Sequence, residues 1–201
     1  MVRETGAAVV RSPLSIPNLL SLLRMGLVPL FVIAVTRGET ARALALFVVA
    51  GVTDALDGFI ARFWDQRTLL GAYLDPIADK LLLTSAYVVL AIPSLNPAMT
   101  IPLWVTILVI ARDLLIVVTA GLLYVALGTR SFPPNWLSKL NTFVQVAAIF
   151  LLLGHLARPA WPTLEALARG FLLAVPVLTV ASGLAYAVRA ARAAGRERAE
   201  G

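Results

Sequence analysis

The chain of 201 residues is 60% hydrophobic and only 14% charged, and it carries a formal net charge of +6. Soluble domains of this length are nearer half apolar and a quarter charged, so the composition excludes a disordered chain, a coiled coil and an ordinary cytosolic enzyme. The absence of cysteine excludes disulfides, thiolate metal ligands and cysteine nucleophiles. These features are typical of a protein that uses lipid as its solvent.

Six apolar segments are long enough to cross a bilayer, which requires about 20 mostly apolar residues each. In chain order they are predicted at 16–36, 41–61, 69–92, 101–127, 137–157 and 168–188. The connections are short and rich in Pro, Gly and polar residues, which is typical of turns and leaves no room for a second domain. We therefore expect one all-α membrane bundle of six transmembrane helices over residues 1–201, with a basic cytoplasmic tail at about 189–201.

The positive residues are unevenly distributed between the two ends of these segments. Ten lie on the side shared by both termini and four on the other side. The ten are Arg3, Arg11, Arg62, Arg67, Arg130, Lys139, Arg189, Arg192, Arg196 and Arg198, and the four are Arg37, Arg42, Arg158 and Arg169. Positive charge concentrates on the cytoplasmic side of short loops, so both termini are predicted to be cytoplasmic, in the cytoplasmic membrane of a prokaryote. The net positive charge is thus explained by the orientation of the helices in the membrane, and no nucleic-acid partner is expected.

Acidic residues inside the second and third segments are the most informative feature of the sequence. A carboxylate at the centre of a membrane helix costs about 2.5 to 3.5 kcal/mol on insertion scales, so it requires a cation or a wet cavity. Asp54 and Asp57 are three residues apart and share a helix face, as do Asp75 and Asp79, which are four apart. Because a short turn joins the two segments, both pairs are expected near the cytoplasmic end of one helical hairpin.

Four carboxylates that converge in low dielectric repel one another unless positive charge lies between them. Oxygen ligands favour hard cations such as Mg²⁺ or Mn²⁺, and Mg²⁺ commonly shares its ligand shell with a substrate phosphate. Gly58, Ala61 and Gly71 are small residues on the same hairpin, and they leave room either for a bulky ligand or for close helix contact. The residues therefore predict a divalent-metal site that faces the cytosol and suits a phosphate-bearing substrate.

The spacing of these residues resembles the signature of the CDP-alcohol phosphatidyltransferase family. The string D-x2-D-G-x2-A-R-x8-G-x3-D-x3-D is satisfied at every position by Asp54, Asp57, Gly58, Ala61, Arg62, Gly71, Asp75 and Asp79. The resemblance implies a membrane enzyme that transfers a phosphatidyl group from CDP-diacylglycerol to an acceptor hydroxyl and releases CMP. It also implies a homodimer surrounded by membrane lipid.

The resemblance also implies a role for each residue of the motif. The four aspartates, Asp54, Asp57, Asp75 and Asp79, would form the site of two divalent metal ions, Mg²⁺ or Mn²⁺. Asp79 would either ligate the second ion or lie just behind the ligands, and would serve as the catalytic general base. The residues assigned to CDP binding are Asp54, Asp57, Gly58, Ala61, Arg62 and Gly71, with Gly58 and Ala61 lining the cytidine pocket and Arg62 pairing with an aspartate or a phosphate.

Two acceptor alcohols fit the resemblance. Glycerol 3-phosphate leads, because phosphatidylglycerophosphate synthases are frequent in the branch that the chain resembles. Phosphatidylglycerol is the alternative, because Arg112-Asp113 and Ser138-Lys-Leu-Asn-Thr142 are similar to the cardiolipin synthases of this family. Arg112 and Lys139 are the cations expected to bind an acceptor phosphate. The alternatives are that Arg112 pairs with Asp113 or Asp79, and that Lys139 is a topogenic charge.

Two further cations lie inside apolar segments. Lys80 either extends toward the membrane surface or offsets the charge of Asp79, and Arg24 is a candidate for function without an assigned partner. A divalent-cation transporter is the alternative from another functional class, because carboxylates inside a membrane also mark ion pathways. That alternative explains metal ligands but not the fixed spacing of the small residues.

Overall fold

The structure is a computed structural model that describes the backbone of residues 16–63, 69–95, 99–127 and 136–200. Side chains in these ranges are described except for 16–17, 57–63, 69–76, 120, 122–127 and 193–200. The described residues form six helices and no strand: α1 (Ile16–Thr36), α2 (Thr40–Phe63), α3 (Leu69–Leu90), α4 (Leu103–Leu127), α5 (Trp136–Ala157) and α6 (Pro162–Glu200). The all-α prediction is therefore confirmed.

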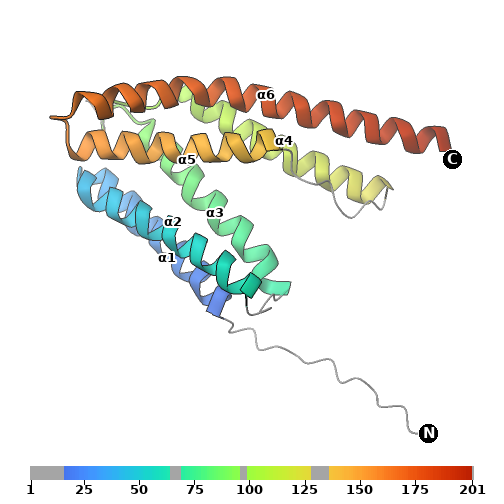
Figure 1. Cartoon of the computed structure of the whole chain (residues 1–201), viewed down its shortest axis with the longest axis horizontal. Coiled ribbons are helices and arrows are strands. Elements are labelled where there is room, and N and C mark those ends of the chain that lie inside the picture. The colour runs from blue at the N-terminus through green and yellow to red at the C-terminus, as the bar shows by residue number, and fades with distance from the viewer. Residues whose placement is uncertain (1–15, 64–68, 96–98, 128–135, 201) are drawn as a thin grey trace, which may run out of the picture.

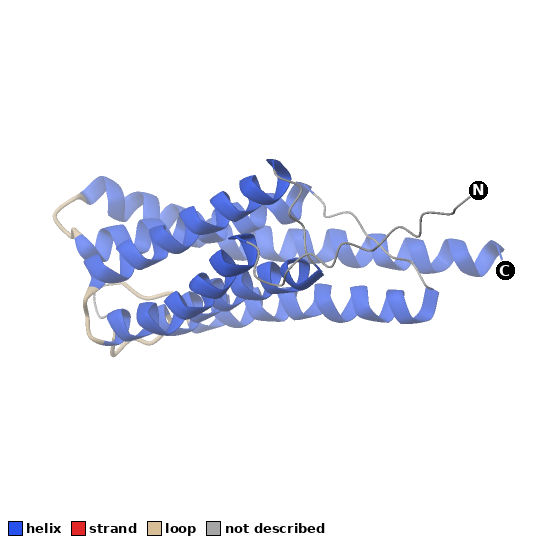
Figure 2. Ribbon diagram, turned by 90° about the horizontal axis from the view of Figure 1, so that it is seen from below, coloured by secondary structure: helices blue, strands red, loops and turns tan. Residues whose placement is uncertain are grey.

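The helices form an elongated bundle. The α5–α6 pair runs along one side of it, the α1–α2 pair lies below that pair in the view of Figure 1, and α3 runs obliquely beside α1. α1 packs against α2 and α3, α2 also packs against α5, and α4 packs chiefly against α6. The described loops gather at one end of the bundle, whereas α1 begins and α6 ends at the other (Figure 2).

The turn between α1 and α2 shows how the sequence ends a helix. Gly38 has a φ of 72°, a left-handed conformation that a side chain disfavours. The backbone N–H groups of Gly38 and Glu39 donate to the carbonyls of Val35 and Ala34, each at 2.9 Å, and satisfy the last carbonyls of α1. The chain therefore reverses within a few residues, and α1 and α2 form an antiparallel hairpin.

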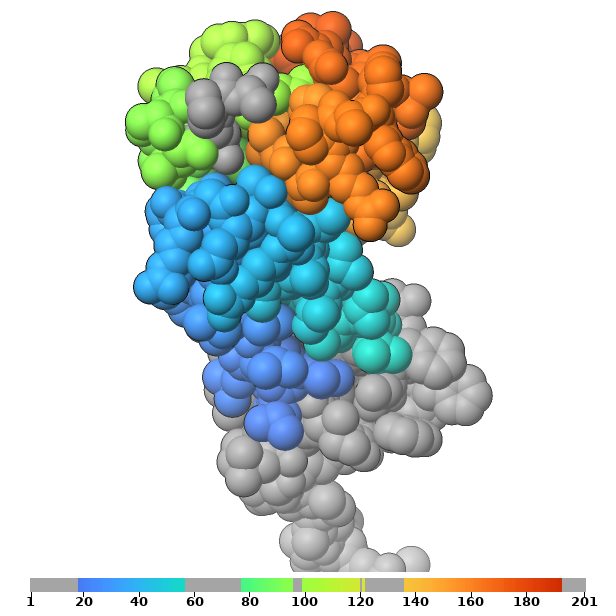
Figure 3. All heavy atoms as spheres, turned by 90° about the vertical axis from the view of Figure 1, so that its left-hand side faces the viewer, coloured from blue at the N-terminus to red at the C-terminus, as the bar shows by residue number. Residues whose placement is uncertain are grey.

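Hydrogen bonds hold the described turns at the loop end of the bundle. Thr40 Oγ1 donates to the carbonyl of Leu156 at 3.3 Å, which joins the start of α2 to the end of α5. The backbone N–H of Ile101 donates to the carbonyl of Leu90 at 3.1 Å and holds the chain between α3 and α4. In space-filling view the α1–α2 turn (blue) lies beside both the start of α4 (green) and the α5–α6 turn (orange) (Figure 3).

The observed helix boundaries follow the predicted ones closely except at α6. α1 matches its predicted range, and each end of α2 to α5 lies within two residues of its prediction. α6 instead begins at Pro162 rather than residue 168 and continues to Glu200 rather than 188. Proline suits the first helical position, and the Ala-, Arg- and Glu-rich end has high helix propensity. The predicted basic tail is therefore helical as far as Glu200.

Small residues allow the helices to approach closely in the core. Ala34, Ala43, Ala50, Ala86 and Ala148 are almost completely buried where the helices cross. Phe31 on α1 and Phe47 on α2 pack with their ring centroids 6.1 Å apart. These contacts position the acidic parts of α2 and α3 beside α1.

The outward faces carry large apolar side chains. On α6, Leu173, Val177 and Leu184 are each more than half exposed, as a helix that faces water would rarely be. Within the described residues, three helices are long and apolar enough to cross a membrane: Asn18–Thr36, Trp136–Ala157 and Pro162–Arg192. The composition and the surface thus agree on lipid surroundings.

Candidate active site

A buried arginine joins the two acidic helices. Arg24 lies on α1 with a side chain that is 0% exposed. Its Nη1 atom lies 2.8 Å from Oδ1 of Asp54 on α2 and 2.6 Å from Oδ1 of Asp79 on α3. Because α1 packs against both helices, a single guanidinium nitrogen reaches both carboxylates.

The sequence predicted no partner for Arg24, although a signal was present. A cation within an apolar segment is expected to meet a carboxylate, and the nearest ones in a hairpin bundle lie on adjacent helices. Ser21 and Asn18 precede Arg24 by three and six residues and are also buried. This spacing of three marks a polar face on α1, and that face could have been aligned with the acidic faces of α2 and α3.

Asp54 and Asp79 border a cavity of about 200 Å³. Its lining comes from α1, α2, α3 and α5, namely Arg24, Phe47, Ala50, Gly51, Asp54, Asp79, Leu82, Leu83, Thr142 and Val146. The side chains of Asp54 and Asp79 are 44% and 49% exposed. A Cβ atom added to Gly51 would meet no other atom within 4 Å, so the wall beside the carboxylates is open. A ligand can therefore reach both acids.

Six other residues of the motif have side chains outside the described ones. They are Asp57, Gly58, Ala61, Arg62, Gly71 and Asp75, and their backbone lies within α2 and α3. Helical geometry puts Asp57 about one turn after Asp54, and Asp75 about one turn before Asp79. Their contacts and roles stay predictions.

The described carboxylates fit a hard divalent cation. One oxygen of Asp54 and one oxygen of Asp79 converge on the same nitrogen of Arg24, so both can face a single positive centre. Carboxylate oxygens are the donors that Mg²⁺ and Mn²⁺ prefer. The cavity beside these half-exposed side chains leaves space for a phosphate. Among the described residues no group of three or more His, Cys, Asp or Glu could hold a metal ion, and Asp57 and Asp75 lie outside that set.

A second charged cluster lies beside the first and joins α3 to α4. Lys80 Nζ pairs with Asp113 Oδ2, and Arg112 Nη1 donates to Asp113 Oδ1 at 2.9 Å. Arg112 Nε donates to Ser182 Oγ on α6 at 3.1 Å. Lys80 therefore pairs with Asp113 rather than with Asp79. The reason is that consecutive helical residues point about 100° apart, so Asp79 turns to α1 while Lys80 turns to α4.

The two residues predicted to bind an acceptor phosphate have different surroundings. Arg112 is buried and pairs with Asp113, which was one of the alternatives that the sequence left open. Its Nη2 atom finds no hydrogen-bond partner among the described residues. Lys139 lies in the first turn of α5 and is exposed. Arg112 thus keeps one donor for an anion, and Lys139 is free to reach outward.

Buried polar side chains connect α5 to α6 behind the cavity wall. Thr179 Oγ1 donates to Asn141 Oδ1 at 3.1 Å and accepts from Gln145 Nε2 at 3.4 Å. All three residues are buried. This network fixes the face of α5 that contributes Thr142 to the cavity.

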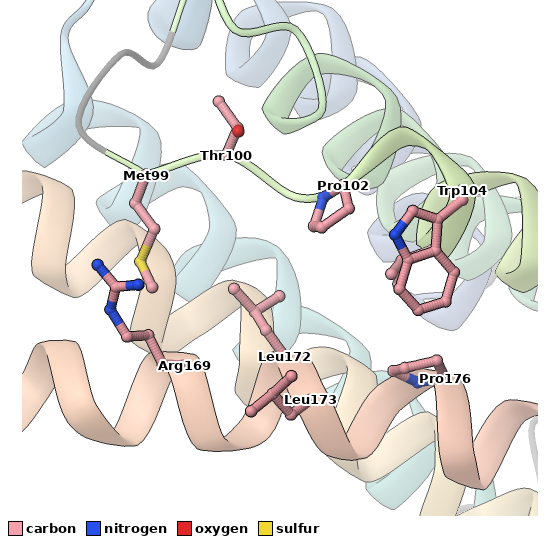
Figure 4. Close-up of a pocket in the computed structure, with 9 residues that line it drawn as sticks. Met99, Thr100, Pro102, Trp104, Arg169, Leu172, Leu173 and Pro176 are labelled. Carbon is pink, nitrogen blue, oxygen red and sulfur yellow. The ribbon is translucent and has the colours of Figure 1, made fainter.

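A larger cavity, of about 410 Å³, lies near the loop end and lacks the groups needed for chemistry. Its lining comes from α4, α6 and the chain before α4, and comprises Met99, Thr100, Pro102, Trp104, Val105, Arg169, Leu172, Leu173 and Pro176 (Figure 4). No carboxylate is among these residues, and the charge of Arg169 is paired with Glu165 at 2.8 Å. The cavity around Asp54 and Asp79 is therefore the candidate active site.

Comparison with known proteins gives matches that extend over most of the chain. A model of the family described as CDP-alcohol phosphatidyltransferase matches residues 14–187. The chain is 38% identical over 200 residues to a probable phosphatidylglycerophosphate synthase of Mycobacterium tuberculosis, covering 96% of this chain and 90% of that protein. It is 40% identical over 186 residues to a CDP-diacylglycerol–glycerol-3-phosphate 3-phosphatidyltransferase of Escherichia coli, covering 89% and 96%. It is 36% identical over 178 residues to a cardiolipin synthase (CMP-forming) of Rattus norvegicus, covering 80% of this chain but only 56% of that protein.

Proposed function

Because the chain belongs to the CDP-alcohol phosphatidyltransferase family, we propose that it transfers the phosphatidyl group of CDP-diacylglycerol to glycerol 3-phosphate in phospholipid biosynthesis. The observation that carries this proposal is the convergence of Asp54 and Asp79 on one cationic atom beside an open cavity. Two relatives whose names specify this acceptor or its product are matched over at least nine-tenths of their length.

The four aspartates of the motif would hold two divalent ions, Mg²⁺ or Mn²⁺. When bound, such ions neutralise the charge of the pyrophosphate and of the departing CMP. Asp54 and Asp79 supply two of the carboxylates from α2 and α3, and Asp57 and Asp75 supply the others. The oxygen-only donor set and the half exposure of the described pair support this assignment.

Asp79 would act as the general base. The acceptor hydroxyl oxygen attacks the phosphorus of the phosphatidyl group, the bond from that phosphorus to CMP breaks, and the hydroxyl proton passes to the Asp79 carboxylate. A carboxylate within hydrogen-bond reach of the hydroxyl can accept that proton. The exposure of Asp79 to the cavity supports this role, because a fully enclosed acid could not meet the acceptor.

The remaining roles concern binding. Gly58, Ala61, Arg62 and Gly71 would accommodate CDP beside the aspartates. Arg112 and Lys139 would bind the acceptor phosphate, and the spare Nη2 donor of Arg112 and the exposure of Lys139 support this.

All six helices would cross the membrane, with both chain ends and the active site on the cytoplasmic side. The alternation of the helices supports this, because α1 begins and α6 ends at the same end of the bundle (Figure 2). Asp54 lies late in α2 and Asp79 lies in the first half of α3, so the site is nearer this end. The protein would work as a homodimer in lipid, on the basis of its family.

Phosphatidylglycerol is the second candidate acceptor. The match to a cardiolipin synthase favours it, together with the Arg112–Asp113 pair and the neutral, buried Asn141 on α5. A bulky phosphodiester acceptor would need the cavity to open toward lipid, and the phosphomonoester of glycerol 3-phosphate would use more cationic contacts.

The experiment that separates these candidates supplies each acceptor to the purified protein in vesicles that contain CDP-diacylglycerol and Mg²⁺. We expect CMP release with glycerol 3-phosphate and phosphatidylglycerophosphate as the lipid product. Release only with phosphatidylglycerol, and cardiolipin as product, would replace the acceptor but keep the family chemistry. Flux of divalent ions across the vesicle membrane without any CMP release would overturn the proposal in favour of a transporter.

A further inference from the structure

Arg24 on α1 reaches both described carboxylates of the site. Its Nη1 atom lies within hydrogen-bond distance of Asp54 Oδ1 and of Asp79 Oδ1. These two ion pairs join α1, α2 and α3 at the guanidinium group. An arginine side chain stays protonated, so this point always carries positive charge.

The exposure of the three side chains is unequal. Asp54 and Asp79 are nearly half exposed at the cavity, but the Arg24 side chain is 0% exposed. The arginine therefore presents its charge from the protein interior and cannot turn to water when the carboxylates change partner. Asn18 and Ser21 are buried on the same face of α1.

Arg24 and a divalent ion would need the same carboxylate oxygens. An ion that binds Asp54 and Asp79 through the oxygens facing Arg24 either displaces Nη1 or lies a few ångströms from it. At that separation, the repulsion between a single charge and a doubly charged ion amounts to about tenfold in a binding constant even at the dielectric of water. Without any ion, the arginine instead offsets the repulsion between the acids.

We propose that Arg24 is a built-in cation that holds Asp54 and Asp79 together in the metal-free protein and competes with the divalent ion for their oxygens. The inference rests on the proposed metal site. It assigns Arg24 the role of a positioning residue, which sets the affinity for metal and the stability of the site without touching the substrate.

The test measures Mn²⁺ binding to the purified full-length protein by the loss of the free Mn²⁺ electron paramagnetic resonance signal, after removal of metal with EDTA. We expect Arg24→Gln to bind Mn²⁺ at least about tenfold more tightly than the wild type. In EDTA the same variant should unfold at a lower temperature than the wild type, and saturating Mn²⁺ should raise its melting temperature more than it raises that of the wild type.

Two variants control for other causes. Arg112→Gln removes a second buried arginine and the same charge, so it should lower the melting temperature but leave the Mn²⁺ affinity within about twofold of the wild type. Arg24→Lys keeps the charge and should also bind Mn²⁺ within about twofold of the wild type. Should Arg24→Gln be recoverable only in Mn²⁺, that metal requirement is the expected destabilisation in its extreme form.

The outcomes distinguish the inference from the proposed function. Equal or weaker Mn²⁺ binding by Arg24→Gln, with normal binding by the wild type, would overturn the competition while leaving the metal site intact. An equal rise in Mn²⁺ affinity in Arg112→Gln would show that the loss of any buried positive charge strengthens binding. That result would also overturn the inference. No Mn²⁺ binding by the wild type would overturn both the inference and the metal-dependent function.

Discussion

The two charged clusters of the bundle differ in the exposure of their acids rather than of their arginines. Arg24 and Arg112 have side chains that are only 0% and 7% exposed. Asp54 and Asp79, which pair with Arg24, are 44% and 49% exposed, but Asp113, which pairs with Arg112, is 14% exposed. An exposed acid can exchange its cation for a ligand, whereas an enclosed acid is held by its partners. The acids of the first cluster therefore suit chemistry, whereas Asp113 in the second suits the joining of helices and leaves Nη2 of Arg112 as a donor for an anion.

The largest effect is expected from Asp79→Asn. The amide cannot accept the hydroxyl proton and is a weaker metal ligand, so CMP release should fall by at least about 10²-fold. The measurement is the rate of CMP release from CDP-diacylglycerol with saturating acceptor and Mg²⁺. Because Asp79 is half exposed, the far-ultraviolet circular dichroism spectrum should stay that of the wild type.

The matched control for Asp79→Asn is Glu165→Gln. It also converts a carboxylate to an amide, but it does so on α6 at the loop end of the bundle. Its CMP release should equal that of the wild type. A fully active Asp79→Asn variant would show that the acids of the first cluster are not required for catalysis.

Asp113→Asn should have the largest effect on stability. The substitution leaves buried Arg112 without its carboxylate, and breaking a buried pair costs about 3 kcal/mol. Lys80 contributes less to this loss because its side chain is 45% exposed. The free energy of unfolding, measured with denaturant in detergent, should fall more for Asp113→Asn than for Asp54→Asn. The reverse order would contradict the structural role of the second cluster.

Thr179→Val should have an intermediate effect. The substitution removes the hydroxyl that joins Asn141 to Gln145 between α5 and α6, and leaves a buried acceptor unpaired. The expected loss is about 1 to 2 kcal/mol of unfolding free energy. Thr163→Val, an exposed position at the start of the same helix, should change it by less than about 0.5 kcal/mol. Equal losses in the two variants would show that the network adds no stability.

The smallest effect is expected where both partners of an ion pair are exposed. Glu165 and Arg169 are four residues apart on α6, with side chains 39% and 62% exposed. Breaking such a helical pair costs about 0.3 to 0.5 kcal/mol. The unfolding free energy of Glu165→Gln should therefore differ from that of the wild type by no more than this. A loss as large as that of Asp113→Asn would contradict the dependence on burial.

Apolar length determined most of the helix boundaries, but it could not locate the ends of α6. A hydropathy criterion registers the part of a helix that faces lipid, so it stopped before the Ala- and Arg-rich continuation. That continuation, up to Glu200, is rich in Ala, Arg and Glu, which have high helix propensity. The start at Pro162 was missed for a similar reason, since the first turns of α6 include Glu165 and Arg169.

The motif spacing identified the helices that bear the site, but not the contact that joins them. Asp54 and Asp79 are 25 positions apart in sequence, and their common partner comes from a third helix, so only tertiary packing brings the three residues together. The same limit explains Lys80. Its neighbour in sequence, Asp79, was the obvious partner, but the direction of the helix turns it to Asp113. The polar residues Asn18, Ser21 and Arg24, spaced by three on α1, were a sequence signal for the partners of Arg24. The motif, which covers only α2 and α3, does not include them.

We propose that the carboxylates around Arg24 form the divalent-metal site that supports phosphatidyl transfer. The most direct test strips the purified protein with EDTA and measures CMP release from CDP-diacylglycerol while Mg²⁺ is added back, for the wild type and for Asp79→Asn. We expect no release by the wild type in chelator, a saturable return of activity as Mg²⁺ rises, and no return in the variant. Full CMP release in excess chelator would show that phosphatidyl transfer does not depend on a divalent metal.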